Sequence, residues 1–379
     1  MASEPLTLVE EKVARGERLD LGDGIALFES DDLIRVGRLA DGVRRAKVGD
    51  DAYFVVNRHI NYTNVCRNHC RFCAFSRDAD EPGAYTLTVD EVVEKAHEAA
   101  AQGAREIHIV GGEHPTMPYA VVRAMITGIH RVAPEAHIKA FTASEIAHFA
   151  QMEGISVEEL LRDLKNAGVA SLPGGGAEIF ASEVREAVCP TKISGEQWLE
   201  VHQTAHRVGL KTTATMLYGH VETVEQRVDH LLRLRAAQDE TGGFLAFIPL
   251  AFQPKNTRLA HLPGPTGVED LKVLAVARLL LDNIAHIKAY WVMTGLKLAQ
   301  VGLFFGADDL DGTVVEEVIS LMSGADHGQV VPKSELVRVI QDAGRMPVER
   351  DALYNAVERF GPRRDTAAAD AVEARTRPA

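Results

Sequence analysis

The chain has 379 residues, of which 46% are hydrophobic and 25% charged, the balance of a globular protein with a large core. Its formal net charge of −13 argues against nucleic-acid binding, since no block of Lys and Arg offsets the acidic excess. The sequence has no stretch of about 18 apolar residues to span a bilayer and no secretory signal. We therefore expect a cytoplasmic protein that acts on small molecules, with no nucleic acid and no membrane among its partners.

Residues 1–50 are helical in pattern and rich in alternating charge, which predicts an N-terminal helical cap. Over 51–324, short β-branched segments alternate with amphipathic helical segments, a pattern that indicates a parallel sheet with helical crossovers. The predicted strands are 53–62, 106–112, 137–142, 171–173, 211–217, 244–250 and 286–291, with a weak eighth near 305–309. Eight repeats predict an α/β fold, a TIM-type (β/α)8 barrel.

The predicted helices between these strands are 89–102, 157–167, 196–208, 224–238 and 268–283. Thr88 and Ser156 each precede a carboxylate by three residues, which fits a capping box at a helix start. After residue 324 the pattern predicts C-terminal helices over 332–343 and 348–360, so that residues 325–360 pack on the barrel. The tail over 361–379 is poor in large apolar residues and is predicted to be disordered.

Three of the four cysteines lie in one short loop after the first predicted strand, as Cys66, Cys70 and Cys73. Thiolates at this C-x3-C-x2-C spacing can each bind a different iron of a 4Fe-4S cluster, which leaves the fourth iron without a protein ligand. That open iron points to a small molecule that chelates it, for which S-adenosylmethionine (SAM) is the candidate. A zinc site prefers paired C-x2-C segments and four ligands, and only one such pair is present. Cys189 is interpreted as a structural thiol.

With Phe72 directly before the last cysteine, the loop resembles the motif of the radical SAM superfamily. Function in a β/α barrel collects at the C-terminal ends of strands. The second strand ends in Gly111, Gly112 and Glu113, which resembles the element that holds the methionyl ammonium of SAM, although a plain turn is the alternative.

Polar residues follow two further strands. Thr142, Ser144 and Glu145 are placed to contact the ribose or the methionyl carboxylate of SAM, or else to cap the next helix. After the fifth strand, Glu222 lies in a segment that resembles the region near the adenine and ribose in this superfamily, which predicts a SAM contact.

Three residues are predicted to be catalytic, although each could instead be a packing residue: His59, Tyr218 and His220. His59 shares one side of its strand with Asn61 and is expected to face the cavity. The candidates for binding a substrate carboxylate are His59, Lys139, Arg258 and Lys288, which the sequence does not rank.

Longer stretches resemble one family, the aminodeoxyfutalosine synthases of menaquinone biosynthesis; they are 137–143, 171–180, 216–220, 286–291 and 308–317. The resemblance implies that a 4Fe-4S cluster reduces SAM, a consumed co-substrate, with an external reductant of the flavodoxin or ferredoxin type. It also implies that the resulting 5'-deoxyadenosyl radical adds to the enol-ether double bond of 3-[(1-carboxyvinyl)oxy]benzoate. Aryl migration and loss of the carboxylate then give 6-amino-6-deoxyfutalosine.

Two alternatives remain open from the sequence. A sister radical SAM enzyme, either the dehypoxanthine futalosine cyclase or a deazaflavin-chromophore synthase, would share the cysteine loop and the barrel. A non-catalytic iron-sulfur or zinc protein would use the three cysteines only to hold structure.

Overall fold

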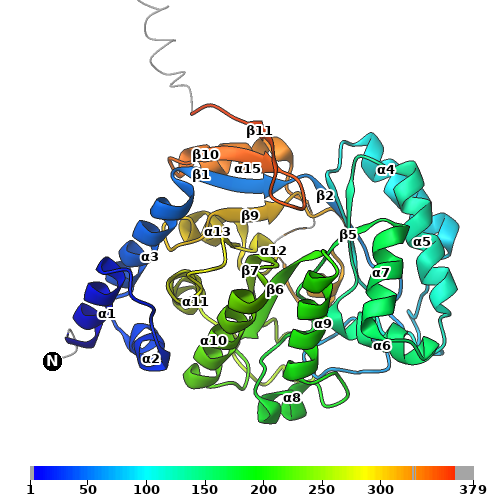
Figure 1. Cartoon of the computed structure of the whole chain (residues 1–379), viewed down its shortest axis with the longest axis horizontal. Coiled ribbons are helices and arrows are strands. Elements are labelled where there is room, and N and C mark those ends of the chain that lie inside the picture. Colours follow the sequence, from blue (N-terminus) through cyan, green and yellow to red (C-terminus); the bar gives the residue numbers. More distant parts are fainter. Residues whose placement is uncertain (1–3, 327, 329, 363–379) are drawn as a thin grey trace, which may run out of the picture.

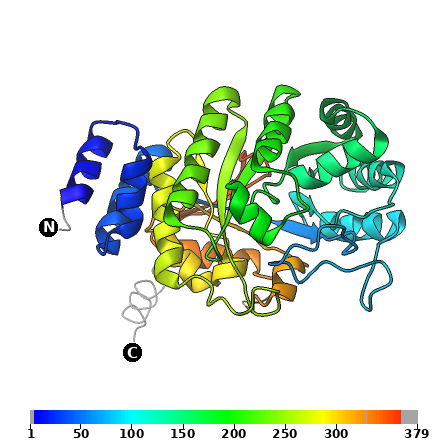
Figure 2. The same cartoon turned by 90° about the horizontal axis from the view of Figure 1, so that it is seen from below.

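A computed structural model describes residues 4–326, 328 and 330–362. The chain begins with three helices, α1 (Glu4–Ala14), α2 (Leu21–Glu29) and α3 (Leu33–Val48). They pack at one side of the molecule, where α3 and α2 contact α10 (Val224–Thr241) and α11 (Gly267–Leu280), as Figures 1 and 2 show. Within the predicted helical cap over 1–50, the described residues 4–50 are therefore mostly helical.

Seven strands form one parallel sheet, in the order β2-β3-β4-β5-β6-β7-β8. Their bounds are β2 Asn57–Ile60, β3 Glu106–Ile109, β4 His137–Ala140, β5 Val169–Leu172, β6 Lys211–Tyr218, β7 Phe244–Ala251 and β8 His286–Ile287. Because the spatial order follows the chain order, each crossover helix lies outside the sheet, and the strands curve into a partial TIM-type barrel. The predicted fold class is confirmed.

The helices that connect these strands are α4 Val89–Ala101, α5 Tyr119–Val132, α6 Ala143–Glu153, α7 Val157–Ala167, α8 Ser182–Val188 and α9 Gly195–Arg207. Thr88 and Ser156 form the predicted capping boxes at the starts of α4 and α7. Figure 1 shows α4 to α7 together along one part of the outside of the sheet, with α8 to α10 beside them.

The predicted eighth strand near 305–309 differs from the structure. The strand there is β9 (Asp309–Gly312), which belongs to a second sheet of order β11-β10-β1-β9. Isolated parallel bridges, Lys288 with Asp309 and Arg58 with Val315, link this segment to both edges of the large sheet. An eighth segment therefore spans the gap between β8 and β2, but it pairs mainly outside the barrel.

The run predicted as one strand over 53–62 is two strands in two sheets. β1 (Asp51–Val55) pairs with β9 and with β10 (Met346–Arg350), whereas β2 pairs with β3. The chain changes sheets at Val56, whose carbonyl accepts the N–H of Arg105 at 2.7 Å. A single residue separates the two extended segments, so the sequence shows no break between them.

The second predicted C-terminal helix, over 348–360, is wrong: the segment forms β10 and the antiparallel strand β11 (Ala356–Arg359). Its apolar spacing imitates a helix. However, Asp351 accepts the N–H groups of Leu353 and Asn355 at 2.8 and 2.9 Å and so turns the chain back on itself. The remaining helices are α12 Trp291–Thr294, α13 Leu296–Gly302, α14 Ile319–Ser323 and α15 Lys333–Asp342, the last lying at the predicted 332–343.

The predicted disordered tail lies, from residue 363 on, outside the described residues. Among the helices that are described, none is long and apolar enough to cross a membrane.

Candidate active site

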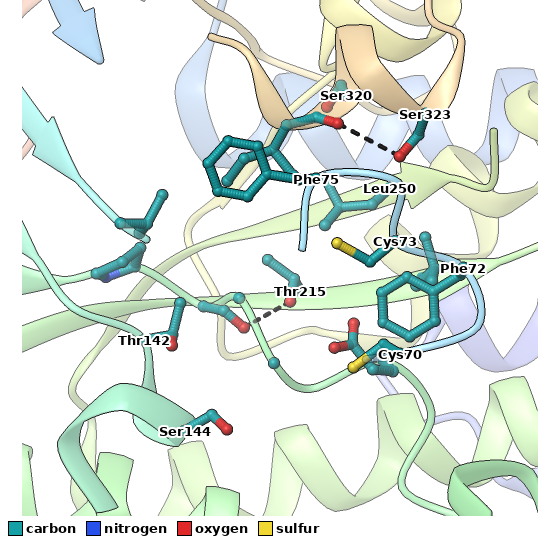
Figure 3. Close-up of a pocket in the computed structure, with 18 of the residues that line it drawn as sticks. Cys70, Phe72, Cys73, Phe75, Thr142, Ser144, Thr215, Leu250, Ser320 and Ser323 are labelled. Atoms are coloured by element: carbon teal, nitrogen blue, oxygen red, sulfur yellow. Dashed lines mark hydrogen bonds between the residues drawn. The ribbon is translucent and has the colours of Figure 1, made fainter. Parts of the chain in front are cut away.

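The loop that carries Cys66, Cys70 and Cys73 covers a cavity at the C-terminal ends of the barrel strands, and all three cysteines line it. Figure 3 shows Cys70 and Cys73 on one side of this space, with Thr142, Ser144 and Thr215 around it. The structure thus brings the predicted cluster ligands and several predicted SAM contacts to one place.

Backbone hydrogen bonds from distant parts of the chain hold the cysteine loop. Arg67 N–H donates to the carbonyl of Glu113 at 3.1 Å, and Arg71 N–H donates to the carbonyl of Val188 at 2.8 Å. The carbonyl of Arg71 accepts the N–H of Arg258 at 2.9 Å. Because three different barrel segments clamp the loop, the thiols are positioned before any ligand arrives.

The residues around the loop fit a 4Fe-4S cluster with SAM bound beside it. The three thiols of the loop line the cavity together, and each could bind a different iron of the cluster. The side-chain nitrogen and oxygen of Asn68, on the same loop and lining the cavity, have no hydrogen-bond partner within the described residues although Asn68 is only 3% exposed. These atoms are available to a bound ligand.

Two of the thiols are protonated until metal binds. Burial raises the pKa of the Cys66 thiol and raises that of Cys70 well above its usual range. Metal binding must therefore release protons from these groups. Cys189 is buried, and burial raises its pKa to about 11; it does not line the cavity, in keeping with its interpretation as a structural thiol.

The glycine pair after β3 allows close packing against the cysteine loop. A Cβ atom at Gly112 would lie 2.3 Å from the carbonyl oxygen of Val65, and one at Gly111 would lie 2.7 Å from the ring of Tyr62. Their N–H groups are already used, by Thr63 and Glu145 respectively. Both glycines line the cavity, but the structure gives their lack of side chains a packing role in addition to the predicted ligand contact.

The acidic residues beside this pair are held by the start of α6. Glu113 is buried and accepts a hydrogen bond from the Ser144 hydroxyl. Glu145 forms the capping box with Thr142 and also accepts the Tyr62 hydroxyl at 2.9 Å. Burial raises the pKa of Glu145 to about 7, against the effect of these hydrogen bonds. The structure confirms that Thr142 and Glu145 cap the next helix. Both residues and Ser144 also line the cavity.

Three predicted site residues do not line the cavity: Tyr218, His220 and Glu222. Tyr218 donates to Asp270 at 2.6 Å, and His220 lies 3.0 Å from the Leu217 carbonyl. Glu222 accepts N–H groups of Gly219 and His220, and its Oε1 lies 2.7 Å from Arg227 Nε. A buried carboxylate such as that of Glu222 needs partners inside the protein. The three side chains therefore hold the loop after β6 in its conformation. The structure therefore gives no support to a catalytic or SAM-contacting role for them.

His59 lies in the cavity wall as predicted, stacked on His108 with ring centroids 4.4 Å apart. Burial lowers the pKa of His59 to about 3, so its ring is neutral at physiological pH. Lys139 lines the same wall, and burial lowers its pKa to about 8. Lys288, by contrast, is fully buried against Asp311, and Arg258 is exposed and does not line the cavity. Asn61 bridges the Val110 carbonyl and the Val318 N–H.

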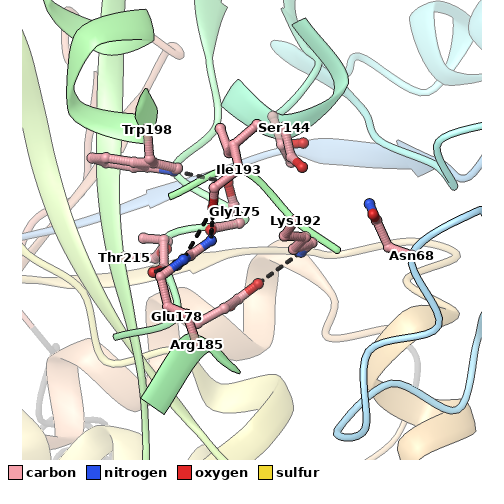
Figure 4. A network of polar contacts seen from close by, with 12 residues as sticks. Asn68, Ser144, Gly175, Glu178, Arg185, Lys192, Ile193, Trp198 and Thr215 are labelled. Carbon is pink, nitrogen blue, oxygen red and sulfur yellow. Dashed lines mark hydrogen bonds and ion pairs between the residues drawn. The ribbon is translucent and has the colours of Figure 1, made fainter. Parts of the chain in front are cut away.

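A polar network on another wall of the cavity, drawn in Figure 4, was not predicted from the sequence. Lys192 pairs with Glu178 at 2.7 Å, and both line the cavity near Cys70. Burial acts to lower the pKa of Lys192, but its ion pair with Glu178 raises the pKa overall, so the ammonium stays charged. Arg185 donates to the carbonyls of Ala177 and Ile193, which fixes the glycine-rich loop after β5. Lys192 lies within a segment that carries no motif.

Other cavity residues were also missed: His108, Tyr290, Asp311 and Glu317. His108 stands in register with His59, so period-two alternation on the second predicted strand could have identified it. Glu317 lies after β9, the strand found near the predicted eighth strand. Burial raises its pKa to about 7.

Comparison with known proteins identifies the class. The model of the radical SAM superfamily matches residues 60–234, and that of the CofH/MqnC C-terminal region matches residues 241–361. The chain belongs to the radical SAM superfamily, and it is an enzyme with a 4Fe-4S cluster and SAM as its cofactors.

Within that superfamily, the chain is similar to aminodeoxyfutalosine synthases, as the sequence motifs indicated. It is 48% identical to the one from Thermus thermophilus, covering 92% of this chain and 95% of that protein. It is 45% identical to the one from Streptomyces coelicolor, covering 93% of this chain and 95% of that protein. A third relative, the 5-amino-6-(D-ribitylamino)uracil--L-tyrosine 4-hydroxyphenyl transferase of Methanopyrus kandleri, is 43% identical over 93% of this chain and 96% of its own.

Solved structures support the fold. Methylornithine synthase has a TM-score of 0.70 at 18% identity, covering 96% of this chain and 99% of that one. The FeFe-hydrogenase maturase HydG from Carboxydothermus hydrogenoformans has a TM-score of 0.69 at 18% identity, covering 93% of this chain and 86% of that one. At such identities the likeness concerns the fold alone.

Proposed function

We propose that this protein adds the 5'-deoxyadenosyl group of SAM to the enol-ether double bond of 3-[(1-carboxyvinyl)oxy]benzoate. Aryl migration and loss of the carboxylate then give 6-amino-6-deoxyfutalosine for menaquinone biosynthesis. The observation that carries the proposal is the 48% identity to an aminodeoxyfutalosine synthase over nearly the full length of both chains.

The cavity suits this reaction. A 4Fe-4S cluster on the cysteine loop supplies, when bound, the electron that cleaves SAM. Ser144, Glu113 and Asn68 offer polar atoms to the nucleoside and methionyl groups, while Leu217, Ile248 and Leu250 give an apolar wall that excludes water. The protein must hold the vinyl carbon roughly 3–3.5 Å from the reacting carbon of SAM before bond cleavage.

The hydroxyphenyl transferase reaction is the second candidate, because one relative of that name is 43% identical over 93% of this chain. Its name specifies tyrosine and a ribitylaminouracil as substrates. The cysteine loop and barrel do not distinguish the two reactions, since both classes of relative match the same length of chain.

One assay separates them. Anaerobically reconstituted protein is incubated with SAM and dithionite, and with either the carboxyvinyloxybenzoate or tyrosine plus 5-amino-6-(D-ribitylamino)uracil. Mass spectrometry then identifies the products. An adenosyl adduct of the benzoate supports the proposal. A hydroxyphenyl-transfer product from the second mixture, or free 5'-deoxyadenosine with no adduct, would contradict it. A protein that binds iron but never cleaves SAM would be a non-catalytic iron-sulfur protein.

The reductant and the location complete the proposal. An external one-electron carrier of the flavodoxin or ferredoxin type would approach the outer side of the cysteine loop, where Cys70 and Cys73 also border a shallow pocket with Arg77 and Arg258. The cytoplasm is the matching compartment, because a reducing environment keeps the thiols free for iron.

A further inference from the structure

Three basic side chains stand side by side in the cavity wall, below the strand ends that carry the cysteine loop. The parallel register pairs His59 of β2 with His108 of β3, and His108 with Lys139 of β4. Residues paired in register point to the same face of a sheet, and all three line the cavity. We call these residues the basic row. His59 is 5% exposed and Lys139 is 3% exposed.

The basic row has donors that the protein leaves unused. His59 Nε2 is buried, and no hydrogen-bond partner for it occurs in the described part of the chain. Lys139 Nζ lies 3.8 Å from its nearest carboxylate oxygen, Glu106 Oε2, which is beyond hydrogen-bond distance. Buried polar groups are nearly always paired, so an unpaired donor in a cavity wall indicates an acceptor that arrives from outside.

The surrounding charges do not fill this need. Asp311 is engaged by Lys288, and Asp309 is engaged by Arg350 at 2.6 Å. Glu106 lies 3.8 Å from both His108 and Lys139, and Asp311, which also lines the cavity and acts on the row, is paired with Lys288. Burial lowers the pKa of both histidines, so they offer neutral ring nitrogens, and Lys139 offers the ammonium group. An arriving carboxylate could accept hydrogen bonds from these groups, which are strong where the local dielectric is low.

The other side of the cavity favours an aromatic acid. Leu217 of β6 and Ile248 and Leu250 of β7 line it with branched aliphatic side chains. A flat ring held against this apolar wall would direct its carboxylate towards the basic row. The reacting double bond must face SAM beside the cysteine loop, so a carboxylate on the far side of the ring lies deepest.

We infer that His59 and Lys139 bind the ring carboxylate of the aromatic substrate and set its orientation. The identity of that substrate as the carboxyvinyloxybenzoate rests on the proposed function. The structure thereby ranks the candidates that the sequence left equal, because Lys288 is already paired and Arg258 does not line the cavity. His59 and Lys139 act here as substrate-binding residues.

The test compares two substrates in three variants. One substrate is the carboxyvinyloxybenzoate and the other is its analogue with a neutral carboxamide in place of the ring carboxylate. For Lys139→Gln and His59→Gln we expect KM for the acid to rise roughly 10- to 100-fold, as the loss of a charge-assisted hydrogen bond predicts, while kcat changes little. KM for the carboxamide should hardly differ between Lys139→Gln and the wild type. His202→Gln, a buried histidine outside the cavity, is the matched control.

The outcomes separate this inference from the proposed function. Wild-type turnover with KM unchanged in both variants would overturn the inference and leave the function standing. If the wild type does not turn over the benzoate, binding of 3-hydroxybenzoate is measured by calorimetry on the reconstituted protein. Weaker binding in Lys139→Gln and His59→Gln then supports the basic row although the proposed function fails. Equal binding in all variants, or none in the wild type, overturns the inference. Thermal unfolding verifies that each variant is folded. If Lys139→Gln does not fold, the comparison is made with His59→Gln alone.

Discussion

Gly112→Ala tests how tightly the cysteine loop is packed against the end of β3. The added Cβ would lie 2.3 Å from the carbonyl oxygen of Val65 and 2.9 Å from the Cβ of Cys66. Real Cβ atoms essentially never come within 3.0 Å of such neighbours, so the two backbones must separate by roughly 0.7 Å at the start of the loop. Backbone clamped by hydrogen bonds moves only at a cost, and we expect a loss of about 2–3 kcal/mol in the free energy of unfolding.

The displacement also moves Cys66, so Gly112→Ala should bind less iron than the wild type after anaerobic reconstitution. Iron content and chemical unfolding measure the two effects. Gly42→Ala is the control, because a Cβ at this exposed site in α3 meets nothing within 4 Å and should stabilise the helix by up to about 1 kcal/mol. Full iron content and unchanged stability in Gly112→Ala would refute the packing role of this glycine.

Three further predictions concern the thiols, a buried histidine and a buried ion pair. Cys70→Ala should lose bound iron and SAM cleavage, whereas Cys189→Ala should keep most of both; equal loss would show that Cys189 is a ligand. Burial lowers the pKa of His230 to about 3, below its unfolded value of about 6.5, so its contribution to stability is complete above pH ~6.5 and is lost as the pH falls. From pH ~6 to ~4, the free energy of unfolding of the wild type should fall by about 1.4 kcal/mol more per pH unit than that of His230→Gln. Parallel pH profiles of the two proteins in chemical unfolding would exclude this role of His230. Glu222→Gln should cost about 3 kcal/mol, because Arg227 loses a buried partner, and a loss below about 1 kcal/mol in the same assay would contradict the role given to Glu222.

The sequence predicts the barrel well because short strand segments alternate with helical segments along the chain. Prediction fails where pairing between distant segments decides the structure. Nothing local separates β1 from β2, since the change of sheet at Val56 depends on β9 and β10, more than 250 residues away. The helix predicted over 348–360 has suitable spacing, but the buried Arg350–Asp309 pair holds this segment as a strand.

The site divides in the same way. The cysteines and the residues just after β3 and β4 are found because they adjoin a motif or a strand end, and they line the cavity. Glu222 has the right sequence context, yet it pairs with Arg227 and does not line the cavity. Lys192 reaches the cavity only through its ion pair with Glu178, a contact that no spacing rule predicts.

The hydrogen bonds of Arg71 also constrain the order of events during synthesis. The cysteine loop lies in the first fifth of the chain, but its partners Val188 and Arg258 leave the ribosome much later. Until those segments have emerged and docked, the loop lacks two of its anchors. Loading of iron in the cell is consequently a late step that follows translation of most of the barrel, and a truncated chain ending before residue 258 should be a poor acceptor from the assembly machinery.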